Sequence, residues 1–400
     1  MEKKRILISI YYMEIGGVER SLLGLLDSID YNHYDVDLFI HRHTGEFMCL
    51  IPDKVNILPQ NTKYATFSRP IYDLFKEGHW GIVLARLLAK VYTTLYIKTH
   101  KIKDYASSFL YTTKYTSPFL PSLYKYGEYD LAISFEEPHN IVRDKFQAKK
   151  KIAWIHTDYS TVNVNAALEL PIWNSYDFIA SISDSVTSAF LKTFPSLKDK
   201  IVMIENILSP AFVREQALVE DVSSEIPNEK TVIKLCSVGR YSTAKNFDNA
   251  PFICKNMIDA GMNIKWYIVG YGGDEALIKK NIEKAKMKER VILLGKKRNP
   301  YPYMQACDIY VQPSRYEGKA VTVIEAQILY KPIVITNFPT SQSQLTDGVD
   351  GVIVPMDNEG AAQGLKIFIE DLELQARLIA NLHNCDFNNE TEVKKIYKLI

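Results

Sequence analysis

The sequence predicts an α/β fold with two consecutive domains, each built on a parallel sheet. Short apolar runs alternate with helix-length mixed segments along most of the 400 residues, a rhythm typical of parallel strands with helices on both sheet faces. Residues 207–230 lose this periodicity and gain proline, serine and charge, which is typical of a domain boundary. We therefore expect a first domain at 1–206 and a second at 207–385.

Composition excludes several classes of protein. The formal net charge of +1 argues against a surface built throughout for nucleic acid, so we expect no nucleic-acid partner. Five scattered cysteines without a Cys-x-x-Cys pair indicate a reducing compartment and no zinc cluster. The first apolar run is too short for a signal peptide, and none approaches the ~18 to 20 uninterrupted apolar residues of a membrane span. We expect a soluble cytoplasmic protein.

In the first half, apolar runs predict parallel strands at 5–11, 35–40, 54–58, 129–135, 151–156, 177–183 and 201–206. Gly16 and Gly17 lie where the first strand turns into a helix. Glycines let backbone amides approach a ligand, and a helix N-terminus favours an anion. The pair therefore predicts a ligand contact, although glycine is also the ordinary residue of a strained turn.

His156 lies at the carboxyl end of the apolar strand at 151–156, beside Asp158. Because the carboxyl ends of parallel strands share one sheet edge, we expect His156 on the same side as Gly16 and Gly17, where it is a candidate catalyst. The alternative is a hydrogen-bonded structural histidine. The Asp35-Val36-Asp37 run lies at the start of its strand, at the wrong end for a ligand site, so we expect no metal there.

Residues 54–125 carry an unusual excess of positive charge. The segment has eleven basic and three acidic residues, an excess of eight positive charges. The basic residues are Lys54, Lys63, Arg69, Lys76, Arg86, Lys90, Lys98, Lys101, Lys103, Lys114 and Lys125, and the acidic ones are Asp73, Glu77 and Asp104. Aromatic residues, among them Tyr105, lie between them. An amphipathic helix of this kind suits an anionic membrane surface. A helix packed on the sheet with a solvated basic face explains the pattern equally well.

In the second half, three successive predicted strands end before a glycine. The strands are 232–238, 264–269 and 291–294, and the glycines are Gly239, Gly270 and Gly295. Such turns, with basic residues after the glycine, suit a phosphate-bearing ligand across one sheet edge.

Basic side chains follow two of these turns. Arg240 and Lys245 come after the first strand, before a helix predicted to start near Asn246, and Lys297 follows Gly295. An arginine fork and a lysine point charge can neutralise two linked phosphates. Surface solvation is the alternative for each residue taken singly.

Residues 308–336 predict a strand at 309–311, a loop, a helix of about ten residues and a strand at 333–335. Glu317 lies in the loop and Glu325 on the helix. At about 100° per residue Glu325 falls on the apolar side of the helix, so we expect it to be partly buried. A buried carboxylate needs partners, and ligand hydroxyls would serve. Alternatively, Glu317 caps the helix and Glu325 is a solvated charge.

Together these motifs resemble the GT-B glycosyltransferases of family 4, the glycosyl transferases group 1. The resemblance is strongest from Val238 to Gly351: Val-Gly-Arg with a later Lys-Asn, Ile-Val-Gly-x-Gly, Asp-Ile-Tyr-Val-Gln-Pro-Ser-Arg-Tyr-Glu-Gly, and Glu-x7-Glu. It is weaker in the first half, where it rests on Gly-Gly-Val-Glu-Arg at 16–20 and Trp-Ile-His-Thr-Asp at 154–158.

This resemblance implies two Rossmann-like domains facing each other across a cleft, with a closing helix at about 386–400 packed back on the first domain. It implies a retaining, metal-independent transfer of a sugar from a nucleotide-diphosphate sugar to a glycan or lipid-linked acceptor, in surface polysaccharide synthesis, without a cofactor. The expected location is the cytoplasm or the inner face of the membrane. A non-catalytic partner subunit and a nucleotide-sugar epimerase are the alternatives.

The resemblance also implies residue roles. Arg240 and Lys245 would bind the diphosphate, Glu325 the ribose, and Glu317 with the amides from Gly318 to Val321 the donor sugar. His156 would line the transfer site. Donor-binding residues are then Gly16, Gly17, Arg240, Lys245, Gly270, Lys297, Glu317, Gly318, Lys319, Ala320, Val321 and Glu325, and the catalytic ones His156, Glu317, Arg240 and Lys245. Lys319-Ala320 departs from the pair many members carry, which leaves the donor open.

Overall fold

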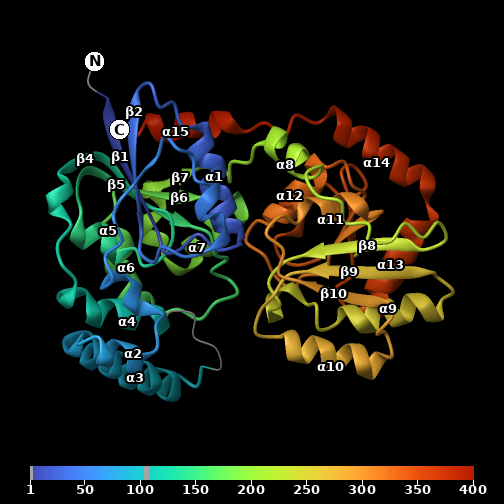
Figure 1. The fold of residues 1–400 in the computed structure, drawn as a ribbon, viewed down its shortest axis with the longest axis horizontal. Helices are drawn as coiled ribbons and strands as arrows, with labels where there is room; N and C mark the ends of the chain where they lie inside the picture. Colours follow the sequence, from blue (N-terminus) through green and yellow to red (C-terminus); the bar gives the residue numbers. More distant parts are fainter. Residues whose placement is uncertain (1–2, 103–107) are drawn as a thin grey trace. The chain divides into compact units, whose positions relative to one another are not determined.

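The computed structural model describes residues 3–102 and 108–400. They form two compact units, the first comprising Met1–Ile207 with Glu390–Ile400 and the second Leu208–Asn389 (Figure 1). The sequence-based boundary after residue 206 therefore lies one residue from the division in the structure. Lys103, Asp104 and Tyr105 of the basic segment lie outside the described residues.

The described part of the first unit contains one seven-stranded parallel sheet in the order β3-β2-β1-β4-β5-β6-β7. Its strands are β1 Lys4–Ile10, β2 Tyr34–Ile40, β3 Asn56–Ile57, β4 Glu128–Ser134, β5 Gln147–Ile155, β6 Phe178–Ser181 and β7 Ile201–Met203. Its helices are α1 Gly17–Ser28, α2 Ile71–Lys76, α3 Trp80–His100, α4 Ser108–Thr116, α5 Asn140–Lys145, α6 Ala166–Asn174, α7 Asp184–Thr193 and α15 Val393–Tyr397.

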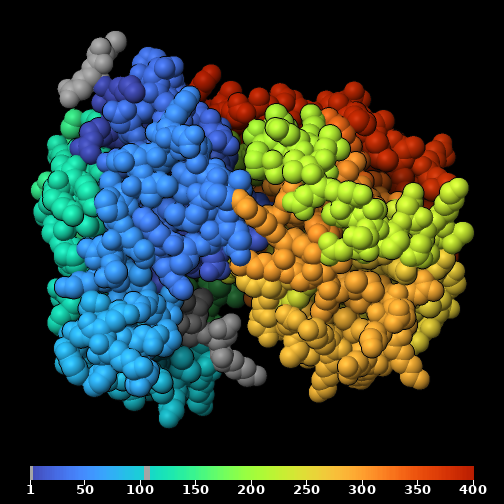
Figure 2. Space-filling view, viewed as in Figure 1, coloured from blue at the N-terminus to red at the C-terminus, as the bar shows by residue number. Residues whose placement is uncertain are grey.

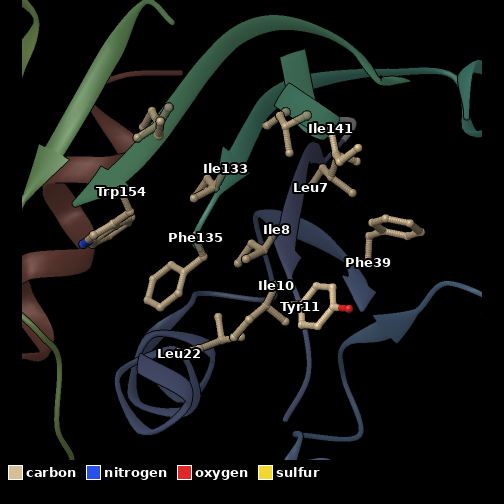
Figure 3. Packing of buried hydrophobic residues seen from close by; sticks show 14 of the residues in the cluster. Leu7, Ile8, Ile10, Tyr11, Leu22, Phe39, Ile133, Phe135, Ile141 and Trp154 are labelled. Carbon is tan, nitrogen blue, oxygen red and sulfur yellow. The ribbon is translucent and has the colours of Figure 1, made fainter. Parts of the chain in front are cut away.

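Alternation along β1 explains how this sheet buries both faces. Figure 3 shows Ile10 of β1 beside Leu22 of α1, and Leu7 on the opposite side of the strand beside Ile141 of α5. All four side chains are buried. Strands covered on both faces read as continuous apolar runs, which is why the sequence located this sheet well.

The second unit repeats the plan with six described parallel strands in the order β10-β9-β8-β11-β12-β13. They are β8 Ile233–Val238, β9 Ile264–Val269, β10 Val291–Gly295, β11 Ile309–Gln312, β12 Ile333–Thr336 and β13 Val352–Val354. The helices are α8 Pro210–Gln216, α9 Ala250–Asp259, α10 Glu275–Ala285, α11 Tyr301–Ala306, α12 Val321–Ile328, α13 Asn358–Glu370 and α14 Leu372–Asn384. In this order β8 and β11 are neighbours.

One predicted helix start is wrong. The segment after β8 forms a short 3-10 turn, Thr243–Lys245, and then Asn246 adopts the left-handed conformation with φ 60°. Asparagine tolerates the left-handed conformation better than most residues. A residue in this conformation commonly ends a helix and does not start one. The helix α9 therefore begins at Ala250, and Lys245 lies in a loop.

The last residues pack on the first unit. Tyr397 of α15 stacks on Tyr34 with ring centroids 4.3 Å apart, and its hydroxyl accepts a hydrogen bond from the Asp30 amide at 2.8 Å. The Glu392 carboxylate accepts one from the Glu205 amide at 2.9 Å. These contacts explain why the chain ends in the unit in which it began.

Candidate functional site

Two strand-to-helix loops of the second unit meet at the carboxyl ends of the neighbouring strands β8 and β11. Arg315 joins them. Its two terminal nitrogens each lie 2.8 Å from one carboxylate oxygen of Asp248, and its backbone amide donates to the Ala244 carbonyl at 2.8 Å. A two-pronged arginine–carboxylate contact fixes orientation as well as distance. The loop at 243–248 is therefore held against the loop at 313–320.

This junction brings together Lys245 and Glu317, two of the predicted catalytic residues. Lys245 Nζ lies 2.6 Å from Glu317 Oε1, and the side chains are only 18% and 12% exposed. Ser314 Oγ at 2.5 Å and Gln312 Nε2 at 3.0 Å donate to the same oxygen. Among the described residues, all three hydrogen bonds to the carboxylate reach Oε1. The carboxylate is thus fixed in position, with Oε2 available for a hydroxyl donor.

Gln312 and Ser314 were missed by the sequence-based reasoning. Both are fully buried, and Gln312 Oε1 accepts hydrogen bonds from the Tyr310 hydroxyl at 2.5 Å and from Thr322 at 3.3 Å. A glutamine that ends an otherwise apolar strand was the available signal, because a buried amide requires partners. The two residues form a rigid base beneath Glu317.

The loop at 317–320 is held by the segment after β12. Thr340 Oγ1 donates to the Glu317 carbonyl at 2.8 Å, and Gln344 Oε1 accepts from the Ala320 amide at 2.6 Å. The expectation that the amides of Gly318, Lys319, Ala320 and Val321 all face a ligand therefore needs correction, because the Ala320 amide has a protein partner. No local pattern points to Gln344, which lies 24 residues further along the chain.

Glu325 is 0% exposed on α12, so its predicted burial is confirmed. Its Oε1 accepts a hydrogen bond from the Tyr301 hydroxyl at 2.8 Å. A tyrosine of α11 therefore supplies one of the partners that we had expected from ligand hydroxyls. Buried carboxylates are retained where such donors offset the loss of hydration.

The glycines after β9 allow two backbones to approach closely. A Cβ on Gly270 would stand 1.9 Å from the Gly239 carbonyl oxygen, and one on Gly272 would stand 2.4 Å from the Tyr241 carbonyl oxygen. Hydrogen bonds connect the same loops, from the Tyr241 amide to the Tyr271 carbonyl at 2.8 Å and from the Asp274 amide back to the Tyr241 carbonyl at 3.0 Å. Gly270 therefore positions the loop that carries the exposed Arg240.

Lys297 lies two residues after β10, in contact with the segment between α8 and β8. Its ammonium pairs with Glu225 and lies 5.0 Å from the centre of the Tyr303 ring. The Tyr303 hydroxyl donates to Glu225 at 2.6 Å. Hydrogen bonds from Lys297 and Tyr303 lower the pKa of the Glu225 carboxyl. These contacts give Lys297 a structural role, because they attach the segment after β10 to Glu225. Its role in donor binding stays a prediction.

Gly16 and Gly17 begin α1 in the first unit. Gly16 is the N-cap, and a Cβ there would stand 2.1 Å from Glu19 Oε2. The buried carboxylate of Glu19 therefore covers the start of its own helix, as acidic residues in a first helical turn commonly do. Part of the positive end that we assigned to a ligand anion is occupied by this side chain.

His156 borders a cavity of about 220 Å³ at the carboxyl ends of β4 and β5, lined also by Glu137, Trp154 and Trp173. Burial lowers the pKa of His156 to about 3, so the ring is neutral near pH 7. Its Nε2 has no hydrogen-bond partner among the residues that the structure describes. Burial, and then repulsion from Glu169, raise the pKa of Glu137 to about 7. The side chains that line this cavity can therefore exchange hydrogen bonds with a ligand, and the Glu137 carboxyl group can hold a proton.

The structure thus places the predicted residues in two groups. Arg240, Lys245, Gly270, Lys297, Glu317, Gly318, Lys319, Ala320, Val321 and Glu325 belong to the second unit, and Gly16, Gly17 and His156 to the first. Within residues 3–102 and 108–400, no cluster of three or more His, Cys, Asp or Glu could hold a metal ion. Asp37, discounted as a metal ligand, instead bonds Arg5 and the Tyr129 hydroxyl.

Comparison with solved structures defines the class of fold. The chain superposes on Anabaena HepE in complex with UDP and glucose with a TM-score of 0.69 and 17% identity, covering 99% of this chain and 98% of the other. Staphylococcus aureus TarM matches with a TM-score of 0.66 and 13% identity over 99% of each chain. The two parallel α/β sheets therefore have the GT-B fold, as predicted.

The second unit contains a segment that matches a known protein family. Residues 220–384 match the model of the family described as glycosyl transferases group 1, which confirms the resemblance predicted from the sequence.

Two relatives similar to this chain are also glycosyltransferases. An N-acetylgalactosaminyltransferase of Campylobacter jejuni that acts on a diphospho-undecaprenol-linked sugar is 27% identical over 53% of this chain and 56% of its own length. The amylovoran biosynthesis glycosyltransferase AmsD of Erwinia amylovora is 27% identical over 52% and 57%. The chain thus matches little more than half the length of these relatives.

Proposed function

We propose that this protein is a retaining, metal-independent glycosyltransferase of family 4 that moves a sugar from a nucleotide-diphosphate sugar to a glycan or lipid-linked acceptor. The observation that carries the proposal is the Lys245–Glu317 pair, fixed at 2.6 Å at the carboxyl ends of β8 and β11. Ligands of open α/β sheets bind at this edge. A nucleotide-diphosphate sugar carries phosphates next to sugar hydroxyls. The cation of the pair suits the phosphates, and the carboxylate suits the hydroxyls.

Lys245 and the exposed Arg240 act on the leaving group. Breaking the bond between the sugar and the diphosphate builds negative charge on the phosphate oxygens. Fixed cations stabilise that charge, and removing one such contact commonly lowers the rate about 100- to 1,000-fold. The diphosphate competes with Glu317 for Lys245, so donor binding redistributes the ion pair.

Glu317 and Glu325 orient the two hydroxyl-bearing ends of the donor. Glu317 Oε1 is occupied by Lys245, Ser314 and Gln312, so its Oε2 accepts from a sugar hydroxyl. Glu325 is buried beside Tyr301 and recognises the ribose hydroxyls. Both carboxylates then bind the donor, and neither is an acid–base catalyst.

The first unit supplies the acceptor side. The neutral His156, whose Nε2 has no hydrogen-bond partner within the described part of the chain, lines the same cavity as Glu137, whose pKa is raised. Both side chains suit hydrogen bonding to sugar hydroxyls. The names of two relatives point to the acceptor class, since one acts on a diphospho-undecaprenol-linked sugar and the other in amylovoran synthesis. We place the protein in surface polysaccharide synthesis on the cytoplasmic side of the membrane.

A thermal-shift screen of UDP-, GDP- and dTDP-sugars tests the donor, because a ligand at about 100 times its Kd stabilises a protein by about 2.7 kcal/mol. Release of nucleoside diphosphate in the presence of EDTA and lipid-linked acceptor tests transfer without metal. NMR of the product tests retention. An epimerised sugar nucleotide without release would favour the epimerase, and binding without any turnover would favour the non-catalytic partner subunit.

A further inference from the structure

The outer face of α3 is apolar and exposed. Its large side chains recur at helical spacing and are between 44% and 60% exposed: Trp80, Leu84, Leu87, Leu88, Val91, Tyr92 and Leu95. Tyr72 and Phe75 of α2 are 65% and 47% exposed. Figures 1 and 2 show α2 and α3 at the lower left edge of the first unit. Soluble proteins seldom expose so long a continuous apolar row unless it contacts something.

The inner face of α3 holds the helix on its unit. Ile82, Val83, Ala85 and Ala89 are buried, and Arg86 on this side donates to the Thr66 carbonyl at 2.9 Å. At the edge of the exposed row, Tyr92 also stacks on Tyr115 of α4, with ring centroids 5.2 Å apart. By length and composition alone α3 could cross a membrane, since it has 21 residues and an 18-residue window with a mean hydropathy of 1.2. These inner contacts instead favour a helix lying flat with one face outward.

Charge around the row favours an anionic occupant. The residues of α3 include Arg86, Lys90 and Lys98 but no aspartate or glutamate. At about 100° per residue, Lys90 and Lys101 fall along one border of the row and Lys98 beyond its end. All three lysines are exposed. Lysines at the border of an apolar face extend their ammonium groups toward lipid phosphates while their stems stay on the apolar side.

We propose that the row from Trp80 to Leu95, with Tyr72 and Phe75, rests on an anionic lipid bilayer and lies in its interface without crossing it. Trp80 and Tyr92 are the residue types that collect at the headgroup level, and the bordering lysines supply the matching charge. A second copy of the chain would oppose these lysines to one another, so charge complementarity favours lipid.

Flotation of the full chain with vesicles tests this proposal. Vesicles of phosphatidylcholine alone are compared with an equal mixture of phosphatidylcholine and phosphatidylglycerol, at low and at high salt. We expect the protein to float with the anionic vesicles and to be released by salt, which screens exposed charge. Equal flotation with both vesicles, or with neither, would overturn the proposal.

Paired variants separate the apolar and charged contributions. Leu84→Ser with Leu88→Ser should abolish flotation, whereas Leu218→Ser with Leu372→Ser, leucines of the second unit that are still more exposed, should leave it unchanged. Lys90→Gln with Lys98→Gln should weaken binding by about fivefold for each lysine, and Lys230→Gln with Lys288→Gln should have less effect. Unfolding temperatures within the range of the wild type show that the exposed substitutions leave the fold intact.

Two further outcomes would contradict the proposal. Retention in cell membranes after carbonate extraction would mean that α3 crosses the bilayer. A dimer in solution that dissociates when Leu84 and Leu88 become serine, without vesicle binding by the wild type, would mean that a second copy covers the row. Neither measurement uses a nucleotide sugar, so failure here is distinct from failure of the proposed transfer activity.

Discussion

Lys245 Nζ lies 2.6 Å from Glu317 Oε1, although 72 residues separate them in the chain. The Arg315–Asp248 contact holds their two loops together, and the buried Gln312 and Ser314 fix the carboxylate. The pair is therefore built into the fold before any ligand arrives. A preorganised site of this kind spends little binding energy on ordering its side chains.

Replacing either partner should abolish transfer while the protein stays folded. Lys245→Ala removes the cation expected on the diphosphate, and Glu317→Ala removes the carboxylate expected on the sugar. We expect kcat/KM to fall at least about 100-fold in each. Lys255→Ala, an exposed lysine of the same unit paired with Asp259, is the matched control. Wild-type turnover by either site variant would remove the roles assigned here.

The same pair should contribute measurably to stability in the absence of donor. Both side chains are mostly buried, and a charge-assisted hydrogen bond contributes about 1.5 to 3 kcal/mol. A double-mutant cycle with Lys245→Ala and Glu317→Gln, followed by urea unfolding, measures the coupling. We expect it to shrink at saturating donor, because the diphosphate then shares Lys245. An unchanged coupling would mean that the diphosphate does not contact this lysine.

Gly270→Ala should disturb the loop that carries Arg240. The new Cβ would meet the Gly239 carbonyl oxygen at 1.9 Å, and relieving such a clash commonly costs about 1 to 3 kcal/mol. Gly273→Ala is the matched control, since a Cβ there meets no atom of the described residues within 4 Å, and it should change stability by less than about 0.5 kcal/mol. Equal unfolding midpoints for the two variants would contradict the packing described for Gly270.

Tyr301→Phe should destabilise the second unit by about 1 to 3 kcal/mol, because it removes the hydroxyl that donates to the buried carboxylate of Glu325. Tyr241→Phe loses a hydrogen bond to a neutral carbonyl, that of Ile268 at 3.1 Å, and should cost less. Urea unfolding of the two variants compares them. If Glu325 binds the ribose, Tyr301→Phe should also weaken nucleotide binding, whereas unchanged affinity would separate Tyr301 from that site.

Glu137 should make stability depend on pH. Its pKa is about 7 in the folded protein against 4.5 ordinarily, so between these values the folded state retains a proton that the unfolded chain has released. Its contribution to stability therefore falls as pH rises from 4.5 to 7, by at most about 1.4 kcal/mol per unit, and is constant above 7. The difference in unfolding free energy between wild type and Glu137→Gln should follow this course. A difference independent of pH would contradict the raised pKa.

The sequence located most strands because buried parallel strands are continuous apolar runs; Ile264–Val269 was predicted at its observed bounds. The sequence-based prediction was wrong where polar residues determine the start of a strand or helix. β5 begins at Gln147 and not at 151, because three lysines at its start resemble a loop. The helix predicted near Asn246 begins four residues later, since the left-handed Asn246 ends the preceding turn.

The charged residues of the site could be proposed from the sequence because they follow strand ends. Their partners could not. Gln344 reaches the Ala320 amide across 24 residues and Tyr301 reaches Glu325 across another 24, and no periodicity encodes such contacts. The cover of α1 by Glu19 depends on a side chain folding back on its own helix, which helical spacing alone does not reveal.

Isothermal titration of a panel of nucleotide-diphosphate sugars into wild type, Lys245→Ala and Lys255→Ala tests the central claim most directly. We expect at least one sugar nucleotide to bind wild type and Lys255→Ala alike, and to bind Lys245→Ala at least about tenfold more weakly, as loss of a charged contact of about 1.5 to 3 kcal/mol requires. Absence of binding to wild type across the panel, or equal binding by Lys245→Ala, would contradict the account.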